Sequence, residues 1–121
     1  MTTKKETRRN FRNNTFERDN YTCKICGNGP HYEQPEAVLD AHHITDRNEM
    51  PNGGYVPENG ITLCKYDENG SEEDSCHMKA ELFHISGGTK WNDGMHPDDL
   101  YKLIGSSKEK AIDKSNKLKI D

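Results

Sequence analysis

Apolar residues are sparse along this chain and gather in a few short stretches. Residues 36–44 contain Val38 and Leu39 and end in an apolar position, which predicts a strand that carries a pair of histidines near its end. Residues 61–63 predict a second short strand. The stretch 45–57 between them holds an Asn-Gly-Gly run and two prolines, so we expect a loop there.

Three later segments show the signals of helices. Ser75 suits the N-cap of a helix over 75–84, Pro97 suits the first turn of another, and the spacing from Ser106 to Glu109 is that of a capping box. The capping box predicts a last, basic helix. The apolar positions expected to face the core recur at helical spacing in the first two of these helices: Met78, Leu82 and Ile85, then Leu100, Leu103 and Ile104.

The first part of the chain is polar and basic. We expect residues 1–8 to be unstructured and residues 10–18 to form a short helix whose narrow apolar face consists of Phe11 and Phe16. The first eighteen residues carry six cations against two acids. A basic arm of this kind is typical of proteins that bind phosphates, although a solvated tail has the same composition.

The composition predicts one small domain that needs disulfides or a structural metal ion for stability. Of 121 residues, 30% are apolar and 31% are charged, so the core is thin. We expect an α+β fold in which a small ββα core surrounds a metal and helical arms flank it. The expected regions are a basic arm over 1–20, the metal core over 21–88 with an acidic insertion at 67–74, and a C-terminal helical arm over 89–121.

Four cysteines can supply this crosslink. Cys23 and Cys26 have the spacing of a metal knuckle, and Cys64 and Cys76 offer a second pair if the acidic insertion folds back as a hairpin. No apolar segment follows the first residue as in a signal peptide, and no run reaches membrane-spanning length, so we expect a cytoplasmic protein with reduced thiols. This favours a structural zinc ion over disulfides. A thiol oxidoreductase is a further alternative, but the chain lacks the βαβ pattern of that class.

The net charge of −4 does not exclude a nucleic-acid partner. Five of the acids lie within residues 67–74, so the negative charge is local. The remainder of the chain is slightly basic and its first segment strongly so. The distribution of charge therefore mildly favours DNA as a binding partner.

Histidines are the candidate metal-binding and catalytic residues. His42 and His43 are neighbours on the predicted strand, so their rings point to opposite faces; at a strand end, one ring can hold a metal while the other faces a substrate. His77 directly follows a cysteine at the start of a predicted helix, which brings a third imidazole to the same core. An ordinary pair of surface histidines is the alternative.

These segments together resemble the HNH nucleases, whose core is a ββα-metal finger. The matching text is Cys23-x-x-Cys26, then Leu-Asp-Ala-His-His-Ile ending at Ile44, then Glu-Asn-Gly-Ile-Thr-Leu-Cys ending at Cys64, then Cys76-His77. The resemblance spans roughly residues 8–85 and is greatest to small HNH proteins of phages and prophages.

The resemblance implies roles for individual residues. His42 and His77 would hold the catalytic divalent ion, His43 would be the general base, and Asn59 would orient it. A histidine at position 42, where the family often has aspartate, favours Zn²⁺, Ni²⁺ or Mn²⁺ more than an all-oxygen site would, and Mg²⁺ is the remaining candidate. Glu81 and His84 lie four and seven residues after His77, so either could complete the metal shell.

The function implied is metal-dependent hydrolysis of DNA by a single ion and a histidine base, as a nick or a double-strand break. DNA is the expected partner, with a phage protein or a second copy of the chain as further candidates, no membrane partner, and the host cytoplasm as the location of a phage-encoded protein. The alternative is a zinc-stapled DNA-binding or packaging module without catalysis.

Overall fold

The computed structural model describes residues 2–120. Within them the fold is mixed α+β, with four α-helices, short 3₁₀ turns and one antiparallel sheet of two strands. The elements in chain order are α1 (Lys4–Arg18), η1 (Pro35–Ala37), β1 (Leu39–His43), η2 (Arg47–Glu49), η3 (Pro51–Gly54), η4 (Pro57–Asn59), β2 (Gly60–Cys64), α2 (Cys76–Ile85), α3 (Pro97–Leu103) and α4 (Lys108–Asn116).

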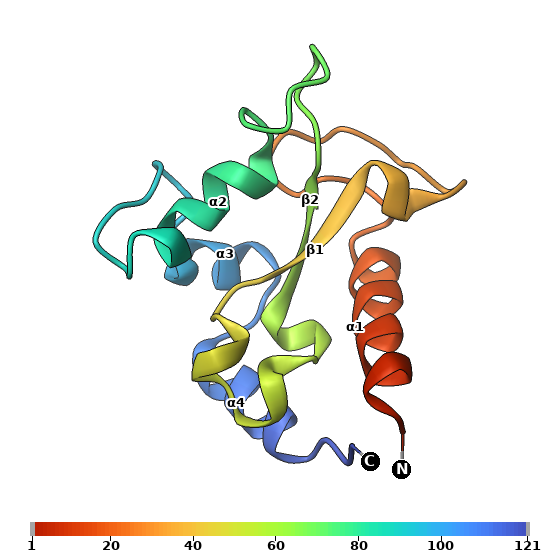
Figure 1. The fold of residues 1–121 in the computed structure, drawn as a ribbon, viewed down its shortest axis with the longest axis vertical. Helices are drawn as coiled ribbons and strands as arrows, with labels where there is room; N and C mark the ends of the chain where they lie inside the picture. Colours follow the sequence, from red (N-terminus) through yellow and green to blue (C-terminus); the bar gives the residue numbers. More distant parts are fainter. Residues whose placement is uncertain (1, 121) are drawn as a thin grey trace.

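The two strands form a central hairpin with helices on both sides of it (Figure 1). Leu39 pairs with Cys64 and His43 pairs with Gly60, so every residue of β1 has a partner on β2. Side chains alternate between the two faces of the sheet. One face packs against α1, and the other meets α2 and α3.

Helix α1 packs closely on the sheet because β2 begins with a glycine. A Cβ atom at Gly60 would lie 2.6 Å from the Thr15 hydroxyl and 2.7 Å from the Phe11 ring, so only glycine fits there. At the end of the helix, the Asp19 carboxylate accepts a hydrogen bond from the Thr62 amide (2.9 Å). Arg18 pairs with Asp19 and donates to the Gly60 carbonyl (2.7 Å). These bonds hold the end of α1 against β2, and the Arg18 guanidinium is occupied by contacts within the protein.

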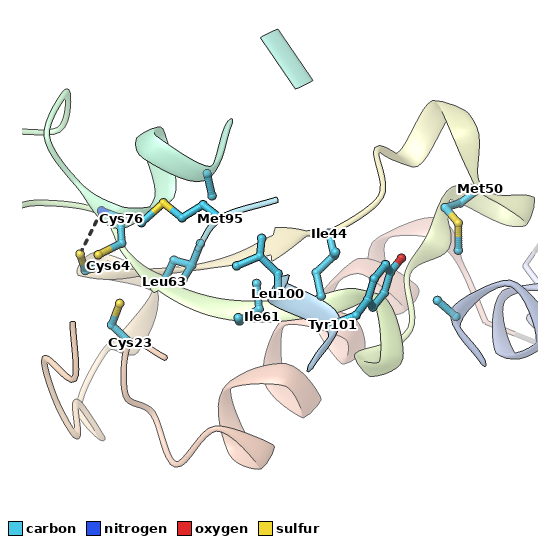
Figure 2. Packing of buried hydrophobic residues seen from close by; sticks show 12 residues of the cluster. Cys23, Ile44, Met50, Ile61, Leu63, Cys64, Cys76, Met95, Leu100 and Tyr101 are labelled. Atoms are coloured by element: carbon cyan, nitrogen blue, oxygen red, sulfur yellow. Dashed lines mark hydrogen bonds between the residues drawn. The ribbon is translucent and has the colours of Figure 1, made fainter. Parts of the chain in front are cut away.

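The apolar core lies on the other face of the sheet. Ile61 and Leu63 of β2 pack with Leu100 of α3, and this cluster extends to the cysteines (Figure 2). The neighbouring helices add Tyr101, which is buried, and Ala80 of α2. This core is narrow, as the composition predicts, and it runs directly into the sulfur cluster.

Several expectations about the elements are confirmed. The strand at 61–63 is the centre of β2, and the helix after Ser75 begins with that residue as its N-cap, whose hydroxyl accepts from the Met78 amide (3.1 Å). The Pro97 helix is α3.

Other expectations are wrong at the ends of the elements. Residues 4–8 belong to α1, because the Thr3 side chain caps its first turn. The strand at 36–44 is shorter, since a 3₁₀ turn occupies Pro35–Ala37. The N-cap of α4 is Ser107, because the Ser106 hydroxyl donates to the Glu58 carbonyl (2.9 Å).

The expected apolar face of α2 is also wrong. Met78 is 40% exposed and Ile85 is 69% exposed, whereas Cys76 and Ala80 are the buried residues of that helix. In α3, Leu103 is 44% exposed and Tyr101 takes its place in the core. The side of α2 that faces the sheet carries His77 and Glu81, which leaves Met78 and Ile85 exposed.

Candidate metal centres

Four cysteines meet at one end of the hairpin. Cys23 and Cys26 come from the knuckle after α1, Cys64 ends β2, and Cys76 begins α2. All four thiols are free, and one ligand atom of each lies within 4.8 Å of the others. The Lys24 amide donates to the Thr62 carbonyl (3.0 Å), which holds the knuckle against β2. Figure 2 shows Cys23, Cys64 and Cys76 gathered beside Leu63.

The acidic insertion folds back as expected. Inside it the Asp67 carboxylate accepts from the amides of Asn69 (2.9 Å) and Ser71 (2.7 Å), and the Asp67 amide donates to the Ser71 carbonyl (2.9 Å). The turn returns the chain to β2, where the Cys76 amide donates to the Cys64 sulfur (3.4 Å). A long insertion therefore does not separate the second cysteine pair.

The thiols perturb one another strongly. A hydrogen bond from Cys76 lowers the pKa of Cys23 to about 4, while the pKa of Cys76 is raised by the same contact with Cys23 and by burial. A cluster in which one thiolate is stabilised by its neighbours matches the tetrahedral sulfur site that zinc prefers. The four cysteines could thus hold a metal ion such as zinc.

A second cluster lies on the α2 face of the sheet. His42 of β1 and His77 and Glu81 of α2 bring one ligand atom each within 4.8 Å of one another. Glu81 Oε1 lies 3.0 Å from His42 Nδ1 and 3.3 Å from His77 Nε2. His77 reaches this position because the insertion folds back. Glu81 follows His77 by four residues on α2, so both side chains lie on the same side of the helix.

The electrostatics of this cluster suit a cation. Burial, which outweighs the attraction of Glu81, lowers the pKa of His42. The neighbouring imidazoles, first His42 and then His77, hold the pKa of Glu81 well below its usual range. His42 Nδ1 is buried and has no partner in hydrogen-bond geometry, although the Glu81 oxygen is close. Two imidazoles and a carboxylate that converge in this way fit a divalent transition metal.

Two further side chains hold the cluster from outside. The Asp40 carboxylate lies 2.8 Å from His77 Nδ1, so it fixes the ring and leaves Nε2 directed at Glu81. Burial lowers the pKa of His77, but Asp40 and Glu81 outweigh it and raise it to about 9. His84 stacks on His42 (ring centroids 5.3 Å apart), and its Nε2 lies 2.9 Å from the His43 carbonyl. His84 therefore contacts the strand, and it is Glu81 whose ligand atom lies together with those of His42 and His77.

His43 lies on the opposite face of β1 from His42. Its ring packs on Phe11 of α1 (centroids 4.5 Å apart) and forms a T-shaped contact with Tyr55 (centroids 4.8 Å apart, 88° between planes). Burial, and then the charge of His42, lower the pKa of His43 to about 4. Its Nε2 atom is buried without a hydrogen-bond partner. The His43 ring is therefore neutral at pH 7. It lies on the face of β1 opposite to the His42 cluster.

Asn59 is completely buried and bonds the loop after β1, with no hydrogen bond to the His43 ring. Its amide oxygen accepts from the Thr45 amide (3.0 Å) and from the Tyr101 hydroxyl (2.7 Å), and its nitrogen donates to the carbonyls of Thr45 (3.0 Å) and Gly54 (3.2 Å). Asn59 thus positions the backbone two residues beyond His43.

Sequence reasoning missed two residues of the site. Asp40 has a recognisable signal, because it lies two residues before His42 and so points to the same face of the strand. Tyr55 has none, since it reaches His43 from an irregular loop.

The comparisons add no relative: no protein-family model, no curated protein and no solved structure matches this chain. Within residues 2–120, no helix has both the length and the apolar character needed to cross a membrane.

Proposed function

We propose that this protein is a metal-dependent endonuclease of the HNH type that hydrolyses phosphodiester bonds of DNA. The observation that carries the proposal is the convergence of His42, His77 and Glu81 at a strand–helix junction whose strand ends in a neutral histidine. On this proposal, β1, β2 and α2 are the ββα-metal core that the resemblance implies.

The chain supplies the groups that such a reaction needs. A divalent ion, when bound by His42, His77 and Glu81, would neutralise charge on a phosphate and its leaving oxygen. Because its pKa is near 4, His43 is unprotonated at neutral pH and can accept a proton from an attacking water. A phosphate lying across the end of β1 would meet the cluster from one face and His43 from the other.

The four-cysteine cluster has a structural role in this proposal. Cys76 and His77 are adjacent in the first turn of α2, so a zinc ion on the cysteines would also fix the start of the helix that carries His77 and Glu81. Zinc at the cysteines and a second divalent ion at the histidines would thus occupy separate sites.

The alternative function is a zinc-stapled DNA-binding module without catalysis, and one observation favours it. The pairing of Asp40 with His77 and of Glu81 with both histidines satisfies most of these charges within the protein itself. A cluster balanced in this way can be purely structural.

Plasmid cleavage separates the two functions. Wild type, His43→Ala and His77→Ala would be incubated with supercoiled plasmid without added metal and with Mg²⁺, Mn²⁺, Ni²⁺ or Zn²⁺ in turn. His31→Ala, a loop histidine outside both clusters, is the matched control. Zinc content and thermal melting would show that each variant is folded.

Metal-dependent cleavage by wild type and His31→Ala, with at least a 100-fold loss in the other two variants, is the expected result. Folded, zinc-containing wild type that leaves the plasmid intact with every metal would favour the binding module. Equal cleavage by His43→Ala would remove His43 as the base.

A further inference from the structure

One side of α1 carries a row of cations, which we call the α1 ridge. The ridge arises because the other side of the helix, including Phe11 and Phe16, is buried against the sheet. Within residues 2–120, no carboxylate lies within ion-pair distance of any member of the ridge. The ridge consists of Lys4, Lys5, Arg8, Arg9 and Arg12.

A groove separates α1 from the loop before β2. It has a volume of about 540 Å³, with Lys4 and Arg8 along one side and Asn52 and Tyr55 among the residues of the other. The loop can approach Tyr55 because Gly53 has a φ of +79° and no side chain; a Cβ atom there would lie 2.5 Å from the Tyr55 ring. The groove is therefore cationic on its helix side and aromatic on its loop side.

Tyr55 connects this groove to the proposed catalytic histidine. The Arg8 guanidinium carbon lies 5.7 Å from the centre of the Tyr55 ring, and the centroid of the same ring lies 4.8 Å from that of His43 in a T-shaped contact. Phe11 lies beneath both rings, 5.8 Å from Tyr55 and 4.5 Å from His43. A polyanion on the α1 ridge would thus lie beside His43.

The opposite end of the molecule would repel the same polyanion. The acidic insertion projects beyond the cysteine cluster, while the two ends of the chain and the start of α1 lie at the other end of the hairpin (Figure 1). Five acids are concentrated in residues 67–74. The charge distribution therefore selects the α1 side for a negatively charged partner.

We infer that the α1 ridge and the groove beside Tyr55 form the surface that holds the backbone of duplex DNA next to His43, an inference that rests on the proposed nuclease function. From Lys4 to Arg12 the helix advances about 12 Å, a length over which one strand of B-form DNA carries about three or four phosphates. The five cations are enough to contact each of them. Since these contacts are to phosphates, the surface holds DNA without reading its sequence.

The test compares two variants with equal loss of charge. The ridge variant combines Lys4→Gln, Arg8→Gln and Arg12→Gln, and the control variant combines Lys24→Gln, Lys90→Gln and Lys102→Gln, which are exposed lysines away from the groove. Glutamine is a good helix former, so α1 is retained. Binding to a fluorescent duplex would be followed by anisotropy without added divalent ion, over a series of salt concentrations.

We expect the ridge variant to bind at least about 10-fold more weakly than wild type and its log–log salt slope to fall by about two to three, while the control variant stays within about twofold. Equal weakening in both variants would overturn the inference, because net charge alone would then explain it. Unchanged binding in the ridge variant, or no binding by wild type, would overturn it as well.

The failure of this surface differs from the failure of the nuclease. Binding is measured without the catalytic ion, so wild type that binds through the ridge but never cleaves would retain the surface and lose the proposed activity. Cleavage by the ridge variant with an unchanged KM for DNA would retain the activity and overturn the surface.

Discussion

The four-cysteine cluster and the His42 cluster are built on the same hairpin and the same first turn of α2, yet their chemistry differs. The cysteines join the apolar core, and three of the four are buried. His42 is buried too, but His77 and Glu81 are half-buried, and His77 is paired with the Asp40 carboxylate. Sulfur ligands closed off by apolar residues are typical of a structural ion, whereas a mixed and partly open ligand set is typical of a site that meets substrate.

The largest effect is expected from the cysteines. Cys23→Ser should abolish folding, because structural zinc typically contributes about 10–16 kcal/mol in small zinc domains and this core is thin. Far-UV circular dichroism and zinc content would measure it. Cys26→His, which keeps a zinc ligand at the exposed position, is the control and should remain folded with zinc bound; a folded, zinc-free Cys23→Ser protein would contradict a structural ion.

The second effect concerns the ligands of the other cluster. His77→Ala should weaken binding of a divalent ion by more than about 100-fold, since it removes a direct ligand and changes outside the ligand set already cost about 10–100-fold. Calorimetric titration of protein that has kept its cysteine-bound zinc would measure the affinity. His31→Ala should bind as wild type does, and equal affinities in the two variants would exclude a metal at this cluster.

A smaller effect should follow from the residue that holds His77. Asp40→Asn removes the charge 2.8 Å from His77 Nδ1, so we expect affinity for the divalent ion to fall by about 10–100-fold while the fold is unchanged. Asp113→Asn breaks a surface ion pair with Lys117 and serves as the control. If Asp40→Asn binds the ion as tightly as wild type, the carboxylate has no part in positioning the ring.

The smallest effect is the pH dependence that buried His43 gives to the stability of the protein. The folded pKa of His43 is about 4, below its unfolded value near 6.5, so the unfolded chain binds more protons in this interval and stability falls as the pH is lowered through it. Between pH 6.5 and 5 the loss should be about 1–2 kcal/mol greater in wild type than in His43→Gln.

Urea unfolding of both proteins at each pH, at equal zinc content, would measure this difference. Because Phe16→Leu also weakens the α1 interface but leaves His43 in place, it should keep the wild-type pH dependence. Parallel pH curves for wild type and His43→Gln would show that His43 is not held neutral by burial.

Local signals in the sequence predicted the elements and the cysteine cluster well. Ser75 and Pro97 mark helix starts by their own backbone chemistry, and the knuckle spacing of Cys23 and Cys26 is a property of a few adjacent residues. The periodic positions Met78 and Ile85 misled because helical spacing shows that a face exists but not which face a partner covers.

The candidate site was predicted in part. The grouping of His42 with His77 followed from the family resemblance, and the structure brings them together with Glu81. The sequence did not predict that the Asn59 side chain bonds the loop after β1 and not the His43 ring. Its partners Gly54, Thr45 and Tyr101 come from three separate segments.

The sequence by itself determined the short-range features of this protein: two strands, the helix starts, the cysteine pairs, and a basic first segment set against an acidic insertion. Only the tertiary structure decided which side of β1 each histidine occupies in relation to α1 and α2, that Asp40 holds His77, and that Tyr55 joins the α1 ridge to His43. The reason is physical. Capping, turns and ligand spacing depend on a few adjacent residues, whereas burial, ring packing and pKa shifts depend on atoms that are brought together only when distant segments pack.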